Sequence, residues 1–345
     1  MPPMTQEKFR QNGASSKRVT MAAVGRMAGV SQVTVSRALS DPSKVSPDAL
    51  RRIREAIEVT GFVPNAIAGA LASNKSRLVT ALIPSITNIV YSSFVRSFSE
   101  RIRNAGYQIL LSETGFDPAE EEALIAAHLS RRPDAMLLTG IHHTAQARRL
   151  LLGANIPVVE VWDLTSSPID FCVGFSHAEA GRSVAEFARE KGYDRAATVT
   201  AADERADRRR DAFSARFEAL GGQKVARADI GGAARIGAGR SALRRLMEEQ
   251  GFTRGVIFCS SDVLAHGVLV EAQVRGLDVP GDIAVIGFGD QDFAADVSPA
   301  LTTVRVDRDA LGTRAAEQVL ARLDESDGID AVTDVGFEIQ QRESC

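Results

Sequence analysis

Residues 20–39 read TMAAVGRMAGVSQVTVSRAL, and this stretch decides the fold of the N-terminal part of the chain. Thr20 is a candidate N-cap, and apolar residues follow it at helical spacing. Residues 28–31 predict a tight turn in which Ser31 caps a second helix over about 32–39. This helix is short and carries small polar side chains after a glycine turn, as a helix that lies in the DNA major groove requires.

A third helix is expected from Pro47 to about Thr60. Proline suits the first turn of a helix, and Leu50, Ile53 and Ile57 would form the apolar face. Together the three segments predict an all-α helix-turn-helix head.

Charge is distributed unevenly along the 345 residues. Residues 1–75 contain 11 Lys and Arg against 5 Asp and Glu, a net charge of +6, whereas the whole chain carries −3. A basic head on an acidic body suggests that one end of the chain contacts the phosphates of a nucleic acid. A chance excess of surface Lys and Arg is the alternative, which the helix-turn-helix pattern disfavours.

The composition is that of an ordinary globular protein with two or three domains, with 44% hydrophobic and 25% charged residues. The three cysteines are far apart, which argues against a disulfide framework and favours a reducing compartment. No apolar run approaches the ~20 residues of a membrane span, and the N-terminus lacks the apolar core of a signal peptide. We therefore expect a cytoplasmic protein with no membrane partner, and a disordered arm at residues 1–17.

From residue 77 onward, strand patterns alternate with amphipathic helices. Strands are predicted at 78–84, 107–112, 135–140, 157–162, 196–200, 255–259 and 283–288. Such alternation indicates an α/β fold with two lobes, each built on a doubly wound parallel sheet. A ligand is expected in the cleft beyond the carboxyl ends of the strands.

Several short motifs in the head together resemble the lactose/galactose-repressor family of bacterial regulators. In the family's order and spacing they are Val19-Thr20-Met21, Ala28-Gly29-Val30-Ser31, Thr34-Val35-Ser36-Arg37-Ala38-Leu39, Val45-Ser46 and Gly61-Phe62-Val63-Pro64-Asn65. Two positions differ and slightly weaken the first helix: Ala23 replaces the usual Asp, and Gly25 the usual Ala. In the body, residues 160–175 and 287–290 look like the gluconate-repressor branch of this family, which implies a sugar-acid effector.

The resemblance implies a head at 18–62, a hinge helix or linker at 63–76 and an effector-binding and dimerisation core at 77–345. This core would resemble periplasmic sugar-binding proteins. Its first lobe is expected at 77–171 and 302–330, and its second lobe at 172–301 and 331–345. Because no leucine heptad ends the chain, a tetramer built on a C-terminal coiled coil is not expected. A homodimer is expected, because a two-fold operator needs two heads. Two heads would match the two halves of a palindromic double-stranded operator.

The resemblance also assigns DNA contacts in the head. Gln32, Val33 and Arg37 match positions that face base edges, where Gln can pair with adenine, Arg with guanine, and Val can touch a thymine methyl. The remaining candidates in the head would contact phosphate or cap helices: Thr20, Ser31, Thr34 and Ser36.

Residues 64–73 match the family's hinge helix, which orders in the minor groove when two protomers pair on an operator. About two turns of helix with Gly69 inside are marginal in water alone, which suits a segment that folds only with a partner. Asn65 and Ala68 are assigned to this contact, and Leu71 matches the apolar wedge that opens a base step. The alternative is a flexible connector with Leu71 packed on the body.

Polar and aromatic residues near the predicted strand ends form the candidate effector site. They are Ser85, Asn88, Tyr91, Gly140, His142, Trp162, Asp163, Arg209, Ser261 and Asp290. Arg209 matches the family's ligand-binding arginine, and a guanidinium can hold a carboxylate or vicinal hydroxyls bidentately. Asp290 matches an acid that faces sugar hydroxyls. Plainer alternatives are a solvated face for Arg208, Arg209 and Arg210, a core position for Trp162, a helix cap for Asp262, and polar surface for His142 and His143.

Two other classes of function fit the sequence less well. A nucleotide-dependent enzyme would place a glycine-rich loop directly after a strand, but residues 231–239 follow no convincing strand pattern. A sugar-binding protein without DNA activity would not need the head and would carry an export signal. We therefore predict a transcriptional regulator of carbohydrate or sugar-acid genes, with no enzymatic activity and no cofactor. Among regulators, a repressor is favoured. The alternatives are a neutral-sugar or nucleoside effector, or a corepressor in place of an inducer.

Overall fold

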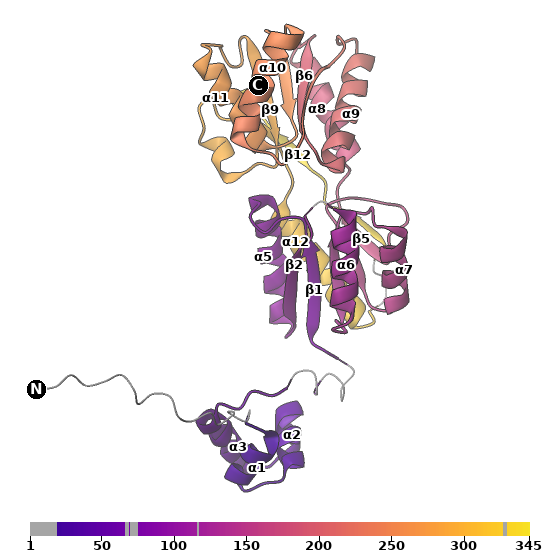
Figure 1. Cartoon of the computed structure of the whole chain (residues 1–345), viewed down its shortest axis with the longest axis vertical. Helices are drawn as coiled ribbons and strands as arrows, with labels where there is room; N and C mark the ends of the chain where they lie inside the picture. The colour runs from indigo at the N-terminus through magenta and orange to yellow at the C-terminus, as the bar shows by residue number, and fades with distance from the viewer. Residues whose placement is uncertain (1–18, 66–68, 70–74, 116, 327–329) are drawn as a thin grey trace, which may run out of the picture. The chain divides into compact units, whose positions relative to one another are not determined.

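The computed structural model describes residues 19–65, 69, 75–115, 117–326 and 330–345. The predicted arm at residues 1–17 and the hinge residues Ala68 and Leu71 lie outside the described residues. The chain divides into two units, Met1–Ser76 and Arg77–Cys345, which are treated separately below (Figure 1). Among the described helices, none combines the length and the apolar character that a membrane crossing requires.

The head, within residues 19–65, consists of α1 (Met21–Ala28), α2 (Gln32–Ser40), the short 3-10 helix η1 (Pro42–Lys44) and α3 (Pro47–Thr60). Thr20, Ser31 and Ser46 are the N-caps of the three α-helices, since each side chain accepts a hydrogen bond from a backbone N–H group of the first turn. The core of the head contains Val24, Ala28, Val35, Ala38, Ile53, Ala56 and Phe62.

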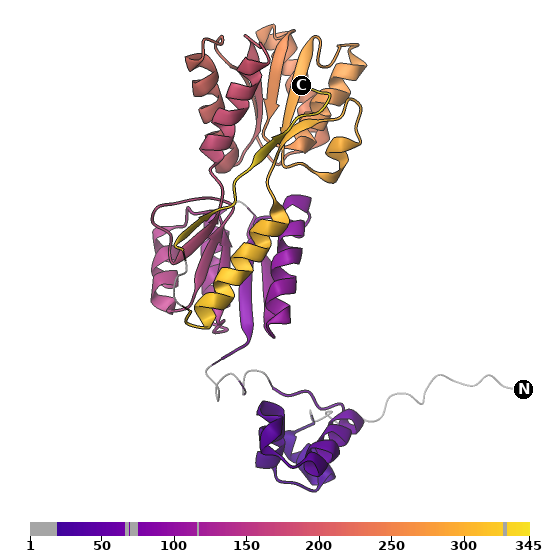
Figure 2. The same ribbon diagram turned by 180° about the vertical axis from the view of Figure 1, so that it is seen from behind.

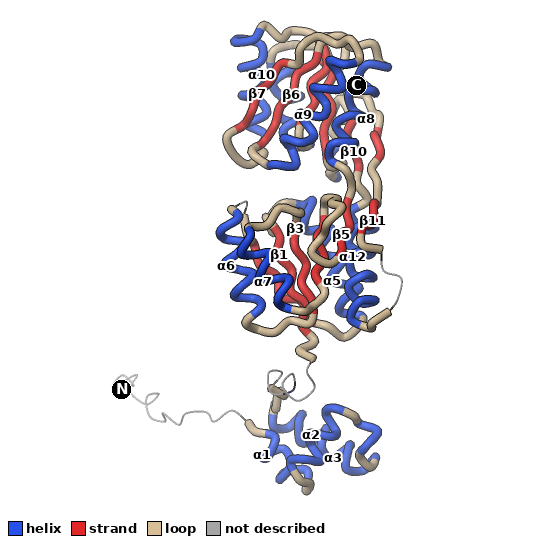
Figure 3. Tube along the Cα trace, turned by 90° about the vertical axis from the view of Figure 1, so that its right-hand side faces the viewer, coloured by secondary structure: helices blue, strands red, loops and turns tan. Residues whose placement is uncertain are grey.

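The first lobe of the body is built on a parallel sheet with the strand order β11-β5-β4-β3-β1-β2. Its strands are β1 (Leu78–Ile83), β2 (Gln108–Glu113), β3 (Ala135–Thr139), β4 (Val158–Val161), β5 (Phe171–Gly174) and β11 (Val332–Asp334). One face packs on α5 (Ile89–Asn104) and α12 (Arg308–Leu323), and the other packs on α6 (Pro118–Leu129) and α7 (Ala145–Ala154). Figure 3 shows the two helix layers on either side of this sheet.

The second lobe repeats this plan with the strand order β12-β10-β9-β8-β6-β7. Its strands are β6 (Ala196–Ala201), β7 (Ala226–Ile230), β8 (Gly255–Cys259), β9 (Ile283–Phe288), β10 (Thr302–Arg305) and the antiparallel β12 (Glu338–Gln340). One face packs on α8 (His177–Glu190) and α9 (Glu204–Ala219), and the other on α10 (Ile236–Gln250) and α11 (Asp262–Val274). The predicted α/β fold class is thus confirmed.

The described sheets divide the body at places other than the expected lobe boundaries. β5 and β11 belong to the first sheet, whereas β10, expected in the first lobe, pairs with β9 in the second. The chain therefore passes between the lobes after Gly174, after Arg305 and after Asp334; Figure 2 shows the last segments running between the two sheets. These crossing strands have only three or four residues, and so short a segment carries no pattern that identifies its sheet.

Strand β7 is a further departure from the sequence prediction. Only its Ala228 is buried, so the strand lacks the apolar pattern by which the others were recognised. Because β7 directly precedes residues 231–239, the inference that no strand precedes these glycines is wrong. A Cβ on Gly239 would lie 2.2 Å from the carbonyl oxygen of Leu264, so this glycine allows α10 and α11 to pack closely.

Candidate DNA-binding surface and effector site

Helix α2 presents the predicted base-contacting residues on one exposed face. Gln32, Val33, Ser36 and Arg37 are exposed, whereas Val35 is fully buried against the other helices of the head. The side chain of Val33 is apolar and yet the residue is 59% exposed, which suits a contact with a partner. The helix therefore offers an amide, a methyl surface, a hydroxyl and a guanidinium together, a set that can bind base edges in a major groove.

The hydroxyls of Thr20, Ser31 and Thr34 already take part in helix capping. Thr20 Oγ1 accepts a hydrogen bond from the Ala23 N–H group at 3.3 Å, and Ser31 Oγ accepts one from the Thr34 N–H group at 3.1 Å. The two side-chain oxygens of Ser31 and Thr34 lie 2.9 Å apart. These hydroxyls hold the starts of α1 and α2 in place, and their contact with phosphate remains a prediction.

Arg37 has no acidic partner within the described part of the head, whereas Arg51 on α3 is paired with Asp48 and Glu55. A phosphate could therefore bind Arg37 without breaking an existing ion pair.

Gly25 permits a close contact between α1 and the turn before α2. A Cβ at this position would lie 2.8 Å from the carbonyl oxygen of Val30, and the Val30 N–H group donates to the Gly25 carbonyl at 2.9 Å. The departure from alanine therefore has a packing role that the sequence pattern did not show.

The predicted effector residues follow the strand ends of both lobes, but several are engaged in local structure. Asn88 is the N-cap of α5 and Ser261 the N-cap of α11. Ser85 Oγ lies 3.1 Å from Thr87 Oγ1. The Gly140 N–H group donates to the carbonyl oxygen of the last residue of β4 at 2.8 Å. These residues shape the loops at the sheet edges.

Trp162 belongs to the core of the first lobe, where it is only 5% exposed. Its ring makes edge contacts with Tyr91 and Phe94, with centroids 5.8 Å and 5.7 Å away. An open platform for a sugar is therefore not what the structure shows, and the core alternative agrees with this burial. Its buried Nε1–H group has no hydrogen-bond partner among the described residues.

The guanidinium of Arg209 is buried in the second lobe. Its Nη1 lies 2.7 Å from His177 Nδ1, its Nη2 donates to the Ser260 carbonyl at 3.1 Å, and its Cζ lies 3.9 Å from the ring centroid of Phe288. Burial lowers the pKa of Arg209 to about 10, so the group stays charged at neutral pH. Among the described residues its Nε has no hydrogen-bond partner and no carboxylate pairs with it, so its charge is incompletely compensated.

His177 connects Arg209 to the first lobe. Since an arginine can only donate, His177 Nδ1 accepts from Arg209, and His177 Nε2–H donates to the Trp162 carbonyl at 2.8 Å. Burial, with the neighbouring guanidinium, lowers the pKa of His177 well below its usual value, which keeps the ring neutral. His177 is not among the site residues predicted from the sequence, because its partners lie on other elements.

Helix α9 of the second lobe reaches the first lobe through two arginines. Arg205 Nη2 donates to the Tyr91 hydroxyl at 2.7 Å, and Arg208 forms a bidentate ion pair with the buried carboxylate of Asp163. A solvated face is therefore the wrong interpretation for Arg208, whose side chain is 31% exposed. Asp163 could accept hydroxyl groups from a ligand only if it exchanged this partner.

The neighbouring histidines of the loop after β3 differ in environment. His142 is exposed and lies 3.1 Å from Glu204 of α9. The side chain of His143 is fully buried, with Nδ1 2.6 Å from Glu121 and Nε2 3.3 Å from Glu160. Polar surface is therefore the wrong interpretation for His143.

Asp290 has a left-handed backbone with φ 45° and accepts a hydrogen bond from Arg342 at 2.7 Å. The helix-cap interpretation of Asp262 is wrong, because Ser261 caps α11 and the Asp262 carboxylate is buried, where it accepts the Gln291 N–H group at 2.7 Å. Burial raises the pKa of Asp262 to about 6. This carboxylate holds the loop that carries Asp290.

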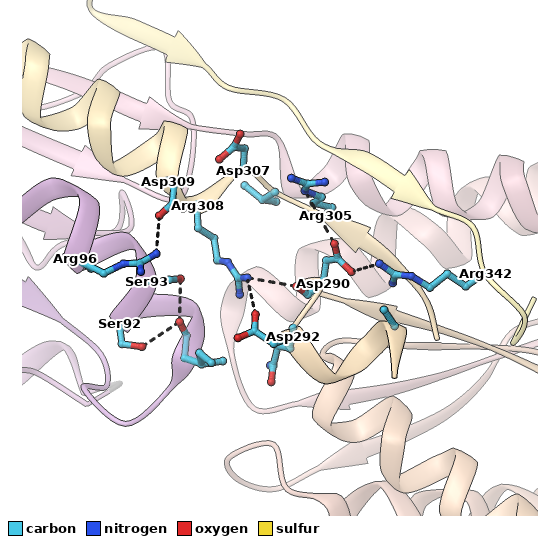
Figure 4. A pocket seen from close by; sticks show the side chains of 14 residues that line it. Ser92, Ser93, Arg96, Asp290, Asp292, Arg305, Asp307, Arg308, Asp309 and Arg342 are labelled. Atoms are coloured by element: carbon cyan, nitrogen blue, oxygen red, sulfur yellow. Dashed lines mark hydrogen bonds and ion pairs between the residues drawn. The ribbon is translucent and has the colours of Figure 1, made fainter. Parts of the chain in front are cut away.

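A cavity of about 610 Å³ lies beside Asp290 (Figure 4). It is lined by the start of α5, the loop after β9 and the segment from β10 to α12, and its wall contains Arg96, Arg305, Arg308 and Arg342. Of the ten predicted effector residues, Asp290 lines this cavity and the other nine do not. In the part of the chain that the structure describes, no three His, Cys, Asp or Glu residues are grouped to hold a metal ion.

Comparison with protein families gives two matches. Residues 20–65 match the bacterial regulatory proteins of the lacI family, and residues 185–345 match the periplasmic binding protein-like domain. The chain is 35% identical over 346 residues to the HTH-type transcriptional regulator GntR of Pseudomonas aeruginosa, covering 99% of this chain and 100% of that protein. It is 31% identical over 323 residues to the regulator GntR of Escherichia coli strain K12, covering 93% and 97%.

Solved structures show the same architecture. A transcriptional regulator of the LacI family from Silicibacter pomeroyi superposes with a TM-score of 0.89 at 31% identity, covering 94% of this chain and 99% of that one. The Lac repressor dimer bound to operator and the anti-inducer ONPF superposes with a TM-score of 0.84 at 21% identity, covering 95% and 99%, and so supports the fold alone. The predicted resemblance, including its gluconate-repressor branch, is confirmed. The relatives are regulators, which also confirms the prediction that the chain is not an enzyme.

Proposed function

The chain belongs to the lacI family of bacterial regulatory proteins and is a DNA-binding transcriptional regulator, and from this premise we propose that it is a cytoplasmic repressor of sugar-acid genes. In this proposal two copies bind a palindromic operator in the absence of effector. Binding of a sugar acid, with gluconate as the first candidate, weakens the grip of the two heads on DNA.

The exposed face of α2 supports the DNA-binding part of the proposal. Gln32, Val33 and Arg37 supply the side-chain chemistry that distinguishes base pairs in a major groove, and a homodimer presents this face twice. Asn65, Ala68 and Leu71 would add the minor-groove contact and the wedge that the family resemblance assigns.

The incompletely compensated charge of Arg209 carries the effector part of the proposal. A buried guanidinium is costly unless an anion or several acceptors complete its hydrogen bonds. In the described structure its Nε, the Nε of Arg208 and the Nε1 of Trp162 are buried without hydrogen-bond partners. Such donors, two from α9 of the second lobe and one from the residue after β4 of the first, suit a ligand rich in oxygen, and an acid group supplies the missing negative charge.

Contacts between α9 and the first lobe provide a route from effector to DNA. Arg205 and Arg208 bind Tyr91 and Asp163 of the first lobe, so a ligand that competes for these groups favours another arrangement of the lobes. A coupling of roughly 1–3 kcal/mol between effector and operator is typical of such linkage. The effector must bind the two lobe arrangements with different affinity.

Two measurements on the full-length protein test the proposal. Selection from a random DNA pool should enrich a palindromic sequence, and gluconate should release that sequence from the protein. A thermal-shift screen should show stabilisation by gluconate or a related sugar acid and not by neutral sugars. Stabilisation by neutral sugars or nucleosides would instead assign another effector class, and tighter operator binding with ligand would assign a corepressor. Selection without any palindrome would refute binding of a palindromic operator.

A further inference from the structure

The cavity beside Asp290 has the size of a ligand site and a lining rich in charged side chains. Its volume of about 610 Å³ is within the range of about 300–1,000 Å³ typical of ligand pockets. The wall combines the four arginines with four aspartates and with the hydroxyls of Ser92 and Ser93; the aspartates are Asp290, Asp292, Asp307 and Asp309. Such a wall offers donors to an acid group and both donors and acceptors to hydroxyl groups.

The four arginines of this cavity are not equivalent. Arg96 and Arg305 are 73% and 49% exposed, so water solvates their charges. The side chain of Arg342 is 20% exposed, but it is compensated by Asp290 at 2.7 Å. Arg308 differs from all three, because it is 16% exposed and its nearest carboxylate is the solvent-exposed Asp292 at 3.9 Å.

The hydrogen bonds of Arg308 are incomplete. Its Nη2 donates to the Asp290 carbonyl at 3.3 Å, and its buried Nη1 has no partner among the described residues. Figure 4 shows the side chain extending from the start of α12 toward the loop that holds Asp290 and Asp292. A buried, poorly paired guanidinium on the wall of a cavity gains most from a bound anion.

Arg209 has less capacity to accept a carboxylate bidentately. Both of its terminal nitrogens are engaged, with His177 and with the Ser260 carbonyl, and Phe288 covers one face of the guanidinium. Two of its five N–H groups are already used, whereas one of the five N–H groups of Arg308 is used. The side chain of Arg308 lines the cavity, and its Nη1 has no hydrogen-bond partner among the described residues.

We propose that Arg308 binds the acid group of the effector in the cavity beside Asp290 and thereby selects a sugar acid over the neutral sugar alcohol. This inference rests on the proposed function and replaces Arg209 with Arg308 as the group that distinguishes the acid. A charge-assisted hydrogen bond at this position gives the acid an advantage of about tenfold or more in affinity.

The test compares two ligands of the full-length protein by isothermal titration calorimetry. Gluconate carries a carboxylate where D-glucitol carries a hydroxymethyl group, so the ratio of their Kd values isolates recognition of the acid. The variants are Arg308→Gln, Arg308→Lys and the control Arg314→Gln, which removes an exposed arginine of the same helix outside the cavity. Operator binding by each variant shows that it is folded.

The wild type and Arg314→Gln should bind gluconate with a Kd about tenfold or more below that for D-glucitol. The two Kd values of Arg308→Gln should agree within about twofold. Arg308→Lys should show part of the wild-type preference for gluconate. If Arg308→Gln binds operator and retains the full preference, the assignment of Arg308 is wrong while the sugar-acid proposal stands. If the wild type shows no preference for gluconate or any other sugar acid, the proposed effector class fails and this inference fails with it. If neither Arg308→Lys nor Arg308→Gln binds gluconate or D-glucitol while both still bind operator, the side chain acts through packing, and this result would also overturn the assignment.

Discussion

The buried histidine of the first lobe should make the stability of the protein depend on pH in a way that one substitution removes. His143 lies between the carboxylates of Glu121 and Glu160, and its side chain is fully buried. Burial by itself would lower the pKa of His143, but the two carboxylates outweigh burial and raise the pKa from 6.5 to about 9. The folded state therefore holds this proton more tightly than the unfolded state does.

The magnitude and sign follow from this difference in pKa. One pKa unit corresponds to about 1.4 kcal/mol, so the protonated histidine contributes roughly 3 kcal/mol to the free energy of unfolding. Since the folded-state pKa is the higher one, this contribution is complete below about pH 6.5 and is lost as the pH rises through about 9. In His143→Gln the contribution should be absent at every pH.

The fluorescence of Trp162, the single tryptophan of the chain, reports unfolding of the same lobe. Urea unfolding from pH 6 to 9.5 should give a gap in stability between wild type and His143→Gln of roughly 3 kcal/mol at the acid end that narrows at the alkaline end. His142→Gln is the matched control and should follow the wild-type curve, because its ion pair with Glu204 is exposed. A gap between wild type and His143→Gln that stays constant with pH would refute the reasoning.

Four further results are expected. Gly181→Ala should lower the free energy of unfolding by about 1–3 kcal/mol, because the new Cβ would lie 2.2 Å from the carbonyl oxygen of Arg209. Gly153→Ala, at a position of α7 with open space around it, should be neutral or slightly stabilising. Equal shifts in melting temperature for the two variants would contradict the packing argument. Arg209→Ala should weaken the effector response with operator affinity retained, because Arg209 and His177 connect the second lobe to Trp162 of the first, and an unchanged release curve would exclude a role for Arg209 in the response. Leu71→Ala should weaken specific operator binding far more than non-specific binding in gel-shift titrations, and equal losses would exclude the wedge. Operator affinity should fall linearly on a log–log plot against salt, because phosphate contacts release counterions, and a flat plot would exclude a phosphate-binding head.

The helices of the head could be predicted closely because their signals are local. Each N-cap hydroxyl of Thr20, Ser31 and Ser46 accepts from a backbone N–H group three residues away, and the apolar spacing of α3 lies within the helix itself. The predicted helix at Pro47–Thr60 accordingly has the same bounds in the structure. Most of the longer buried strands could be predicted for the same reason, because a continuous run of apolar residues indicates a buried strand.

The sequence could predict which residues follow the strand ends, but not which of their side chains are already engaged. The positions of Trp162, Asp163 and Asp290 could be predicted, because these residues follow predicted strands. Whether each side chain already has a hydrogen-bond or ion-pair partner depends on residues of other elements. Asp163 forms an ion pair with Arg208, and Asp290 forms one with Arg342. No sequence pattern marks such pairs, because their members are brought together only when the helices pack on the sheets.

The sequence by itself determined the helix-turn-helix head, the alternation that gives two α/β lobes, and the family with its regulatory role. Each of these depends on side-chain order over a few neighbouring residues or on motifs in series. Only the tertiary structure decided to which sheet β5, β10 and β11 belong, that His143 is buried between two carboxylates, and that Arg308 is left with a free donor on a cavity wall. Burial, ion pairing and charge compensation depend on groups that are distant in the chain. They are decided only when the packed lobes bring those groups together or keep them apart.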